Sequence, residues 1–108
     1  MDDCLFCKIA SGEINTDLVY ETESVLVFRD INPQAPLHVL VIPRKHISTA
    51  NDVAAADAGL VGEMELKAEG YAESGYRLVM NCNADAGQTV FHIHLHLLAG
   101  RSLTWPPG

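Results

Sequence analysis

The sequence contains no apolar run that approaches the roughly 20 residues needed to cross a bilayer. Its first residues, Met1-Asp2-Asp3-Cys4, carry acid where a signal peptide carries base. Basic residues are scarce, seven against fourteen acidic ones, and the formal net charge is −7. A chain of this charge has no global positive field to attract nucleic acid or an anionic membrane, although a local anion pocket stays possible. We therefore predict a cytoplasmic protein with no nucleic-acid and no membrane partner.

Cysteine is also sparse, with three thiols in the whole chain. An odd number of thiols and the lack of an export signal argue against a disulfide framework. Free thiols or a metal site are the remaining interpretations, and Cys82, which has no cysteine or histidine nearby in sequence, is expected to be a small core residue.

The length of 108 residues suits one domain with one core, and 48% apolar with 19% charged residues excludes general disorder. No repeat or low-complexity tract divides the chain, so residues 1–108 form a single predicted domain. Two prolines near the end, Pro106 and Pro107, favour an extended C-terminal tail over residues 101–108.

Hydrophobic periodicity predicts an α+β fold. A short helix is expected over residues 4–10, and a long helix over residues 51–70, with Asn51 as its N-cap and Gly70 at its end. Strands are expected over residues 18–22, 25–30, 37–43, 76–82 and 89–98. The short connections favour a five-stranded antiparallel sheet with one long and one short helix, both covering one face.

Three histidines alternate with apolar residues near the end of the chain. Because side chains of a strand alternate between faces, His92, His94 and His96 are expected to share one face. The residues between and beside them, Phe91, Ile93, Leu95 and Leu97, are expected in the core. A solvated strand face and a three-histidine metal site are the alternative interpretations, and periodicity alone does not exclude the metal site.

The segment from His92 to Leu98 resembles the His-φ-His-φ-His-φ-φ signature of the histidine triad (HIT) superfamily. Residues 30–38 and 42–46 are similar to the first half of that family, and residues 87–90 and 105–108 are similar to its nucleoside phosphoramidase branch. The resemblance implies a HIT-like fold and hydrolysis of a purine nucleoside 5′-phosphoramidate through a nucleotidyl-histidine intermediate, with no catalytic metal.

The resemblance also implies catalytic roles. His94 attacks the α-phosphorus, His38 supports the charge of His94, His96 binds phosphate oxygens, and the Thr89 hydroxyl gives a proton to the leaving nitrogen. The family has serine at the Thr89 position. Substrate-binding residues carried over in the same way are Phe6, Phe28, Asp30, Ile31, Asn81, Gly87, Gln88, Thr89, His96 and Trp105. Without the family, Phe6, Phe28 and Ile31 read as core residues, and Asp30 reads equally well as a turn cap.

Cys4 and Cys7 have the spacing of half a structural zinc site. Some bacterial HIT proteins resemble this chain in adding two histidines, here His46 and His92. The resemblance therefore implies a structural zinc bound by Cys4, Cys7, His46 and His92. A pair of buried free thiols is the alternative.

The resemblance further implies a homodimer whose sheet continues across the interface and whose tail, with Trp105, reaches the partner's site. The stretch from Leu60 to Arg77 is about five residues shorter than the family pattern. Two other functions stay open at this point: a dinucleoside polyphosphate hydrolase, and a nucleotide-binding regulatory dimer with vestigial activity. A nucleotidyl transferase is disfavoured, because that branch has glutamine in place of His96.

Overall fold

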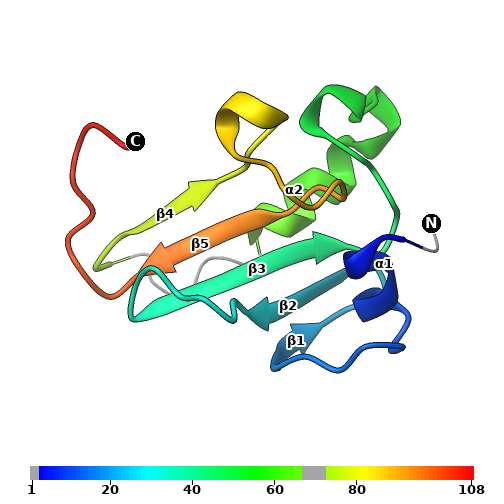
Figure 1. The fold of residues 1–108 in the computed structure, drawn as a ribbon, viewed down its shortest axis with the longest axis horizontal. Helices are drawn as coiled ribbons and strands as arrows, with labels where there is room; N and C mark the ends of the chain where they lie inside the picture. Colours follow the sequence, from blue (N-terminus) through cyan, green and yellow to red (C-terminus); the bar gives the residue numbers. More distant parts are fainter. Residues whose placement is uncertain (1–2, 67–72) are drawn as a thin grey trace.

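The computed structural model describes residues 3–66 and 73–108, and over these ranges it is an α+β fold built on one antiparallel sheet (Figure 1). The strands are β1 (Leu18–Glu21), β2 (Val25–Arg29), β3 (Leu37–Pro43), β4 (Tyr76–Val79) and β5 (Leu95–Ala99). Their order across the sheet is β1-β2-β3-β5-β4. The long central strand β3 pairs with β2 on one side and β5 on the other, so it connects both halves of the sheet. The predicted five-stranded antiparallel sheet is confirmed.

The two helices lie on opposite faces of this sheet. Met64 of α2 (Ala58–Leu66) packs with one set of strand residues, which includes Val25, Val39 and Val41. Phe6 of α1 (Leu5–Ala10) packs with the alternate set, which includes Leu26, Phe28, Leu40 and Ile42. The prediction that both helices cover one face was wrong. Residues 25–28 and 38–43 are buried without interruption, which shows that the central strands have an apolar environment on both sides.

The second helix begins later than predicted. Residues 50–52 and 55–57 form two 3₁₀ turns, and the α-helix starts only at Ala58. Thr49, not Asn51, caps the first turn, and the carboxylate of Asp52 accepts hydrogen bonds from the main-chain N–H and hydroxyl of Thr49. Short polar side chains that bond the nearby main chain in this way compete with a continuous helix. The predicted end at Gly70 lies outside the described residues.

The last strand is shorter than predicted and begins at Leu95, not at residue 89. Residues 89–94 are irregular, and the main-chain N–H of Ile93 bonds to Ile47 O at 2.7 Å, outside the sheet. Ile93, Leu95 and Leu97 are buried as expected, but Phe91 is 47% exposed, so its predicted core position was wrong. Strand β4 likewise ends at Val79, three residues before the predicted end.

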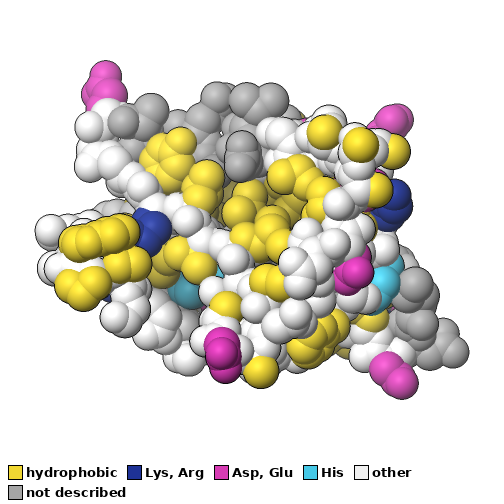
Figure 2. All heavy atoms as spheres, turned by 90° about the horizontal axis from the view of Figure 1, so that it is seen from above, with side chains coloured by type: hydrophobic (Ala, Val, Ile, Leu, Met, Phe, Trp, Pro, Cys, Tyr) yellow, Lys and Arg dark blue, Asp and Glu magenta, His cyan; other side chains and the backbone are white. Residues whose placement is uncertain are grey.

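Figure 2 shows the face seen from above in Figure 1, where apolar side chains gather toward the middle and acidic side chains lie at the margin. Among the described residues no helix is long and apolar enough to cross a membrane.

Candidate active site and metal centre

His92 precedes β5, but the three histidines share one face as predicted: the ring of Phe6 contacts both His92 and His94, His94 contacts His96, and the residues between them lie in the core of the other face. His92 is fully buried, and its Nε2–H donates to the main-chain carbonyl of Pro43 at 2.7 Å. A carbonyl oxygen can only accept, so the proton lies on Nε2 and the lone pair lies on Nδ1. Nδ1 faces the thiols of Cys4 and Cys7, at 3.4 and 3.5 Å. His92 therefore belongs to a cluster with the cysteines.

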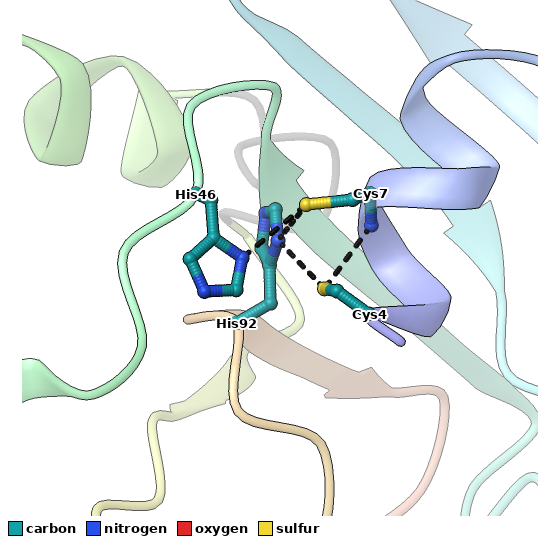
Figure 3. A group of neighbouring side chains, drawn as sticks. All are labelled: Cys4, Cys7, His46 and His92. Atoms are coloured by element: carbon teal, nitrogen blue, oxygen red, sulfur yellow. Dashed lines mark hydrogen bonds between the residues drawn. The ribbon is translucent and has the colours of Figure 1, made fainter. Parts of the chain in front are cut away.

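That cluster contains the four residues proposed as metal ligands, Cys4, Cys7, His46 and His92 (Figure 3). Cys4 is the N-cap residue of α1, Cys7 lies one turn later, and His46 follows β3. The Nδ1 atom of His46 lies 3.2 Å from Cys7 Sγ, and the four donor atoms all lie within 4.8 Å of one another. Three segments distant in sequence thus place two sulfurs and two imidazole nitrogens around one point.

The distances fit tetrahedral zinc. Zinc–sulfur and zinc–nitrogen bonds of about 2.3 and 2.05 Å at tetrahedral angles put sulfur and nitrogen about 3.6 Å apart. The sulfur–nitrogen distances involving Cys4 and Cys7 are 3.2 to 3.5 Å. The outer nitrogens of the two histidines are also occupied, His92 by Pro43 O and His46 by Ser48 Oγ at 3.2 Å, as is typical of metal-bound imidazoles. The donor set fits a structural zinc with four protein ligands.

Burial and the neighbouring Cys4 raise the pKa of the Cys7 thiol. Without a metal the Cys7 thiol therefore retains its proton at neutral pH, and a metal bound there would displace that proton.

His94 is held by the main chain of His92. Its Nδ1–H donates to the carbonyl oxygen of His92 at 2.9 Å, so Nε2 carries the lone pair. The imidazole is 8% exposed, and the ring of Phe6 contacts it edge to face at a centroid distance of 4.9 Å. Burial lowers the pKa of His94, which favours the neutral imidazole. Nε2 of His94 thus carries a lone pair, which a nucleophilic role would require.

His38 of β3 and His96 of β5 extend the site across the sheet. The main-chain N–H of Gln34 donates to His38 Nδ1 at 3.0 Å, which leaves the proton of neutral His38 on Nε2. His38 Nε2 then donates to His96 Nδ1 at 2.9 Å, and Asp30 Oδ2 lies 3.4 Å from the same nitrogen. By the same logic the proton of His96 lies on its Nε2. The main-chain N–H of Gln34 therefore determines the tautomer of His38, and His38 determines that of His96. We call this group the relay (Gln34 N–H, His38, His96 and Asp30).

Burial, reinforced by His94 and His38 close by, lowers the pKa of His96 to about 4. At neutral pH His96 is an uncharged donor through Nε2–H. Its ring centroid lies 5.0 Å from that of His94, so the two imidazoles adjoin one another. Uncharged His94 beside an N–H donor is the arrangement that attack on a phosphorus and stabilisation of the added charge require.

Asp30, His38 and His96 also satisfy the spacing of a metal site. The tautomers argue against a metal there, because His38 would have to move its proton from Nε2 to Nδ1, where it would face the N–H of Gln34. The three-histidine metal site that periodicity left open is disfavoured too. The lone pair of His92 is directed at the thiols, and Nδ1 of His94 is bonded to a carbonyl.

The predicted base-binding residues do not share one environment. Phe6 and Phe28 are 4% and 3% exposed, and their rings meet edge to face at 5.7 Å. Ile31 is 98% exposed, which contradicts its interpretation as a core residue and leaves it free to contact a ligand. Oδ1 of Asp30 accepts the N–H of Asn32 at 2.8 Å, which confirms its interpretation as a turn cap, while Oδ2 faces His38.

The loop before the histidines holds the remaining predicted residues. Gly87 adopts φ +85°, a left-handed conformation that favours glycine. The buried Gln88 side chain bonds the main chain at Asn83 (N–H) and at Ser48 and Val90 (carbonyls), so it fastens this loop. Thr89 is exposed and lines a surface pocket of about 450 Å³. In the single chain, Asn81 is partly buried and Trp105 is 80% exposed.

Sequence analysis missed the residues that orient the histidines through their main chains. Gln34 and Pro43 act through an N–H and a carbonyl, and no side-chain pattern marks such a contribution. Both residues lie inside the segments 30–38 and 42–46, which resemble the family. That resemblance was the one feature of the sequence that could have indicated them.

Comparison with known proteins agrees with this geometry. A family model described as scavenger mRNA decapping enzyme C-terminal binding matches residues 3–104. A purine nucleoside phosphoramidase of Escherichia coli K12 is 49% identical over 94% of this chain and 91% of its own length. An uncharacterized HIT-like protein of Synechocystis is 47% identical over 99% of this chain and 98% of its own length.

Solved structures give the same result. A HIT family hydrolase from Legionella pneumophila has a TM-score of 0.95 at 55% identity, over 98% of this chain and 100% of that one. A histidine triad protein from Clostridium difficile has a TM-score of 0.90 at 42% identity, over 96% of each chain. Motif, geometry and near full-length similarity lead to one conclusion: this chain belongs to the histidine triad family.

Proposed function

We propose that this protein hydrolyses the P–N bond of purine nucleoside 5′-phosphoramidates. The observation that carries the proposal is the orientation of His94: its Nδ1 is bound to His92 O, and its Nε2 lone pair is free beside the His38–His96 pair. The E. coli relative at 49% identity, named a purine nucleoside phosphoramidase, supports the choice of substrate.

In the proposed first step Nε2 of His94 attacks the α-phosphorus. A P–Nε2 bond forms, the P–N bond to the amine breaks, and the leaving nitrogen takes a proton, for which we propose the Thr89 hydroxyl as donor. The Nδ1–H···O bond to His92 stabilises the positive charge that develops on His94. Water then attacks the phosphorus and gives one proton back to the Thr89 oxygen, the P–Nε2 bond breaks with its electron pair returning to Nε2, and the nucleoside monophosphate leaves.

The other residues bind the substrate in this proposal. His96 Nε2–H donates to a phosphate oxygen, and Asp30 accepts from the ribose hydroxyls. The base packs against Phe6, Phe28 and Ile31, of which Ile31 is almost fully exposed in the single chain. Asn81 and the loop of Gly87, Gln88 and Thr89 border the phosphate, with Gln88 acting through the shape of the loop that it fastens.

The test is hydrolysis of adenosine 5′-phosphoramidate in the presence of EDTA, with native protein and His94→Gly. We expect turnover by the native protein, none by the variant, and partial recovery of the variant when free imidazole is added, because the cavity left by the side chain can admit a replacement nucleophile. Diadenosine polyphosphate, assayed in parallel, addresses the alternative hydrolase. Native protein that binds AMP without releasing amine would refute the proposal in favour of a nucleotide-binding module.

We also propose that the cluster of Cys4, Cys7, His46 and His92 holds a structural zinc. The sulfur–nitrogen distances of 3.2 to 3.5 Å and the oriented outer nitrogens support it. Zinc there ties α1 and the segment after β3 to His92, whose carbonyl oxygen binds His94. Elemental analysis of protein purified without chelator should give about one zinc per chain, and less than a third of an equivalent would count against the site.

We also propose that the protein is a homodimer in the cytoplasm. The exposure of Trp105 (80%) and Ile31 (98%) in the single chain suits residues that a partner and a substrate cover. Light scattering at micromolar concentration should give twice the chain mass, and a monomeric mass would remove this part of the proposal.

A further inference from the structure

Arg101 lies two residues after the end of β5 and is connected to the relay through the main chain of Gln34. Its guanidinium donates from Nε and Nη2 to the carbonyl oxygen of Gln34, at 3.3 and 3.0 Å, and from Nη1 to Ser102 O at 3.0 Å. The N–H of the same Gln34 donates to His38 Nδ1 at 3.0 Å. Gln34 therefore accepts from Arg101 through its carbonyl oxygen and donates to His38 through its N–H.

The loop from Asp30 to Leu37 has few other constraints near Gln34. The Gln34 side chain bonds only Asn32 O, within the same exposed loop. Two residues from the start of the tail contact this loop. Gly100, at φ +93°, packs against Pro36, and Arg101 donates to Gln34 O. The end of β5 thus sets the position of a loop 67 residues earlier in the sequence.

The orientation of Gln34 matters because His38 has two possible neutral tautomers. With the Gln34 N–H at Nδ1, the proton of His38 must lie on Nε2 and be shared with His96 Nδ1. If that N–H turned away, the alternative tautomer, with the proton on Nδ1, would no longer be opposed. His38 Nε2 would then be an acceptor facing the acceptor atoms of His96 and Asp30, and His96 would lose its partner.

We propose that Arg101 is a positioning residue, which fixes the main chain of Gln34 and thereby the tautomer of His38 and the orientation of His96. It touches no reacting atom in this proposal. Its use in catalysis rests on the proposed function, but its effect on the His38 tautomer does not. Two donors of a planar guanidinium on one oxygen hold that oxygen in direction as well as in distance, which a lysine ammonium does less well.

The experiment compares native protein with Arg101→Gln, Arg101→Lys and Arg77→Gln. Arg77 is the matched control, because it also donates to main-chain carbonyls, those of Leu103 and Thr104, but has no bond to Gln34. The first readout is the nitrogen-15 spectrum of the histidine rings without substrate, which separates N–H from lone-pair nitrogens. We expect one His38 tautomer with the proton on Nε2 in the native protein and Arg77→Gln, a mixture in Arg101→Gln, and an intermediate result in Arg101→Lys.

The second readout is steady-state hydrolysis of adenosine 5′-phosphoramidate. Loss of one charge-assisted hydrogen bond predicts a fall in kcat of about fivefold to tenfold in Arg101→Gln with little change in KM, and partial recovery in Arg101→Lys. An unchanged His38 tautomer in Arg101→Gln overturns the proposal, and so does a mixed tautomer with unchanged kcat. If the native protein shows no turnover, the proposed function fails while the ring spectra still decide whether Arg101 sets the tautomer. If Arg101→Gln does not fold, Arg101→Lys alone decides, since it must show the mixture and the lower kcat.

Discussion

Gly100, between β5 and Arg101, offers a quantitative test of how the tail is joined to the loop that carries Gln34. Its φ of +93° is a conformation that L side chains rarely adopt, and a Cβ added there would lie 2.9 Å from Cβ and 3.3 Å from Cγ of Pro36. The positive φ costs a non-glycine residue about 1–2 kcal/mol. The contact adds about 1–2 kcal/mol, because the proline ring cannot turn away as a flexible side chain would.

Gly100→Ala should therefore lower the free energy of unfolding by about 2–4 kcal/mol, which for a chain of this size lowers Tm by about 8–16 °C. The assay is thermal and urea unfolding followed by circular dichroism at one fixed protein concentration. Gly12→Ala is the matched control, because Gly12 has φ +83° and no atom within 4 Å of an added Cβ, so it should lose only the conformational part. Gly62→Ala, inside α2 with open space around it, should gain up to about 1 kcal/mol. If Gly100→Ala is no less stable than Gly12→Ala, the contact with Pro36 is not a constraint and the reasoning fails.

Three further predictions concern the core, the metal and pH. Met64→Ala, at a fully buried position against the sheet, should cost about 2–5 kcal/mol in urea unfolding, and a loss under 1 kcal/mol would mean that the core collapses around the gap. Cys7→Ala should abolish zinc binding and should have the lower Tm that the native protein reaches in excess chelator. A native Tm that chelator leaves unchanged would contradict a structural zinc. The pKa of His96 is lowered to about 4 in the folded protein, against about 6.5 in the unfolded chain. As the pH falls, the unfolded chain therefore takes up a proton first. The contribution of this histidine to stability should be complete above pH 6.5 and decline toward pH 4 by up to about 1.4 kcal/mol per pH unit. Urea midpoints measured in EDTA at pH 7.5 and 5 test this, and His96→Asn should show a shallower decline; equal slopes for the two proteins would contradict it.

Local sequence was sufficient for the architecture of the sheet and for the identity of the candidate site. The apolar runs at 25–28 and 38–43 and the turns between them predict antiparallel strands, and β2, β3 and α1 lie within one or two residues of their expected bounds. The order of histidine and apolar residues correctly placed Ile93, Leu95 and Leu97 in the core. The Cys-X-X-Cys spacing selected Cys4 and Cys7, and the resemblance to the HIT family added the histidines that the structure gathers into one metal-compatible cluster and one row of imidazoles.

Periodicity failed where the chain leaves regular structure. Residues 50–57 have an apolar pattern suited to a helix, but Asp52 and Asp57 bond the main chain of Thr49 and Ala54 and produce two short turns instead. Residues 89–94 alternate like a strand, but no strand among the described residues pairs with them, and Phe91 is exposed. A local pattern does not contain the information about which partner strand is within reach.

The sequence by itself determined which side chains are available: a row of histidines, an acid before His38, and two thiols one helical turn apart. Only the tertiary structure decided what each imidazole does. The proton of His92 is placed by Pro43 O, that of His94 by His92 O, and that of His38 by the N–H of Gln34. These partners are main-chain groups, which do not distinguish one residue type from another. Their positions follow from the folded path of the chain and not from the identity of the side chains.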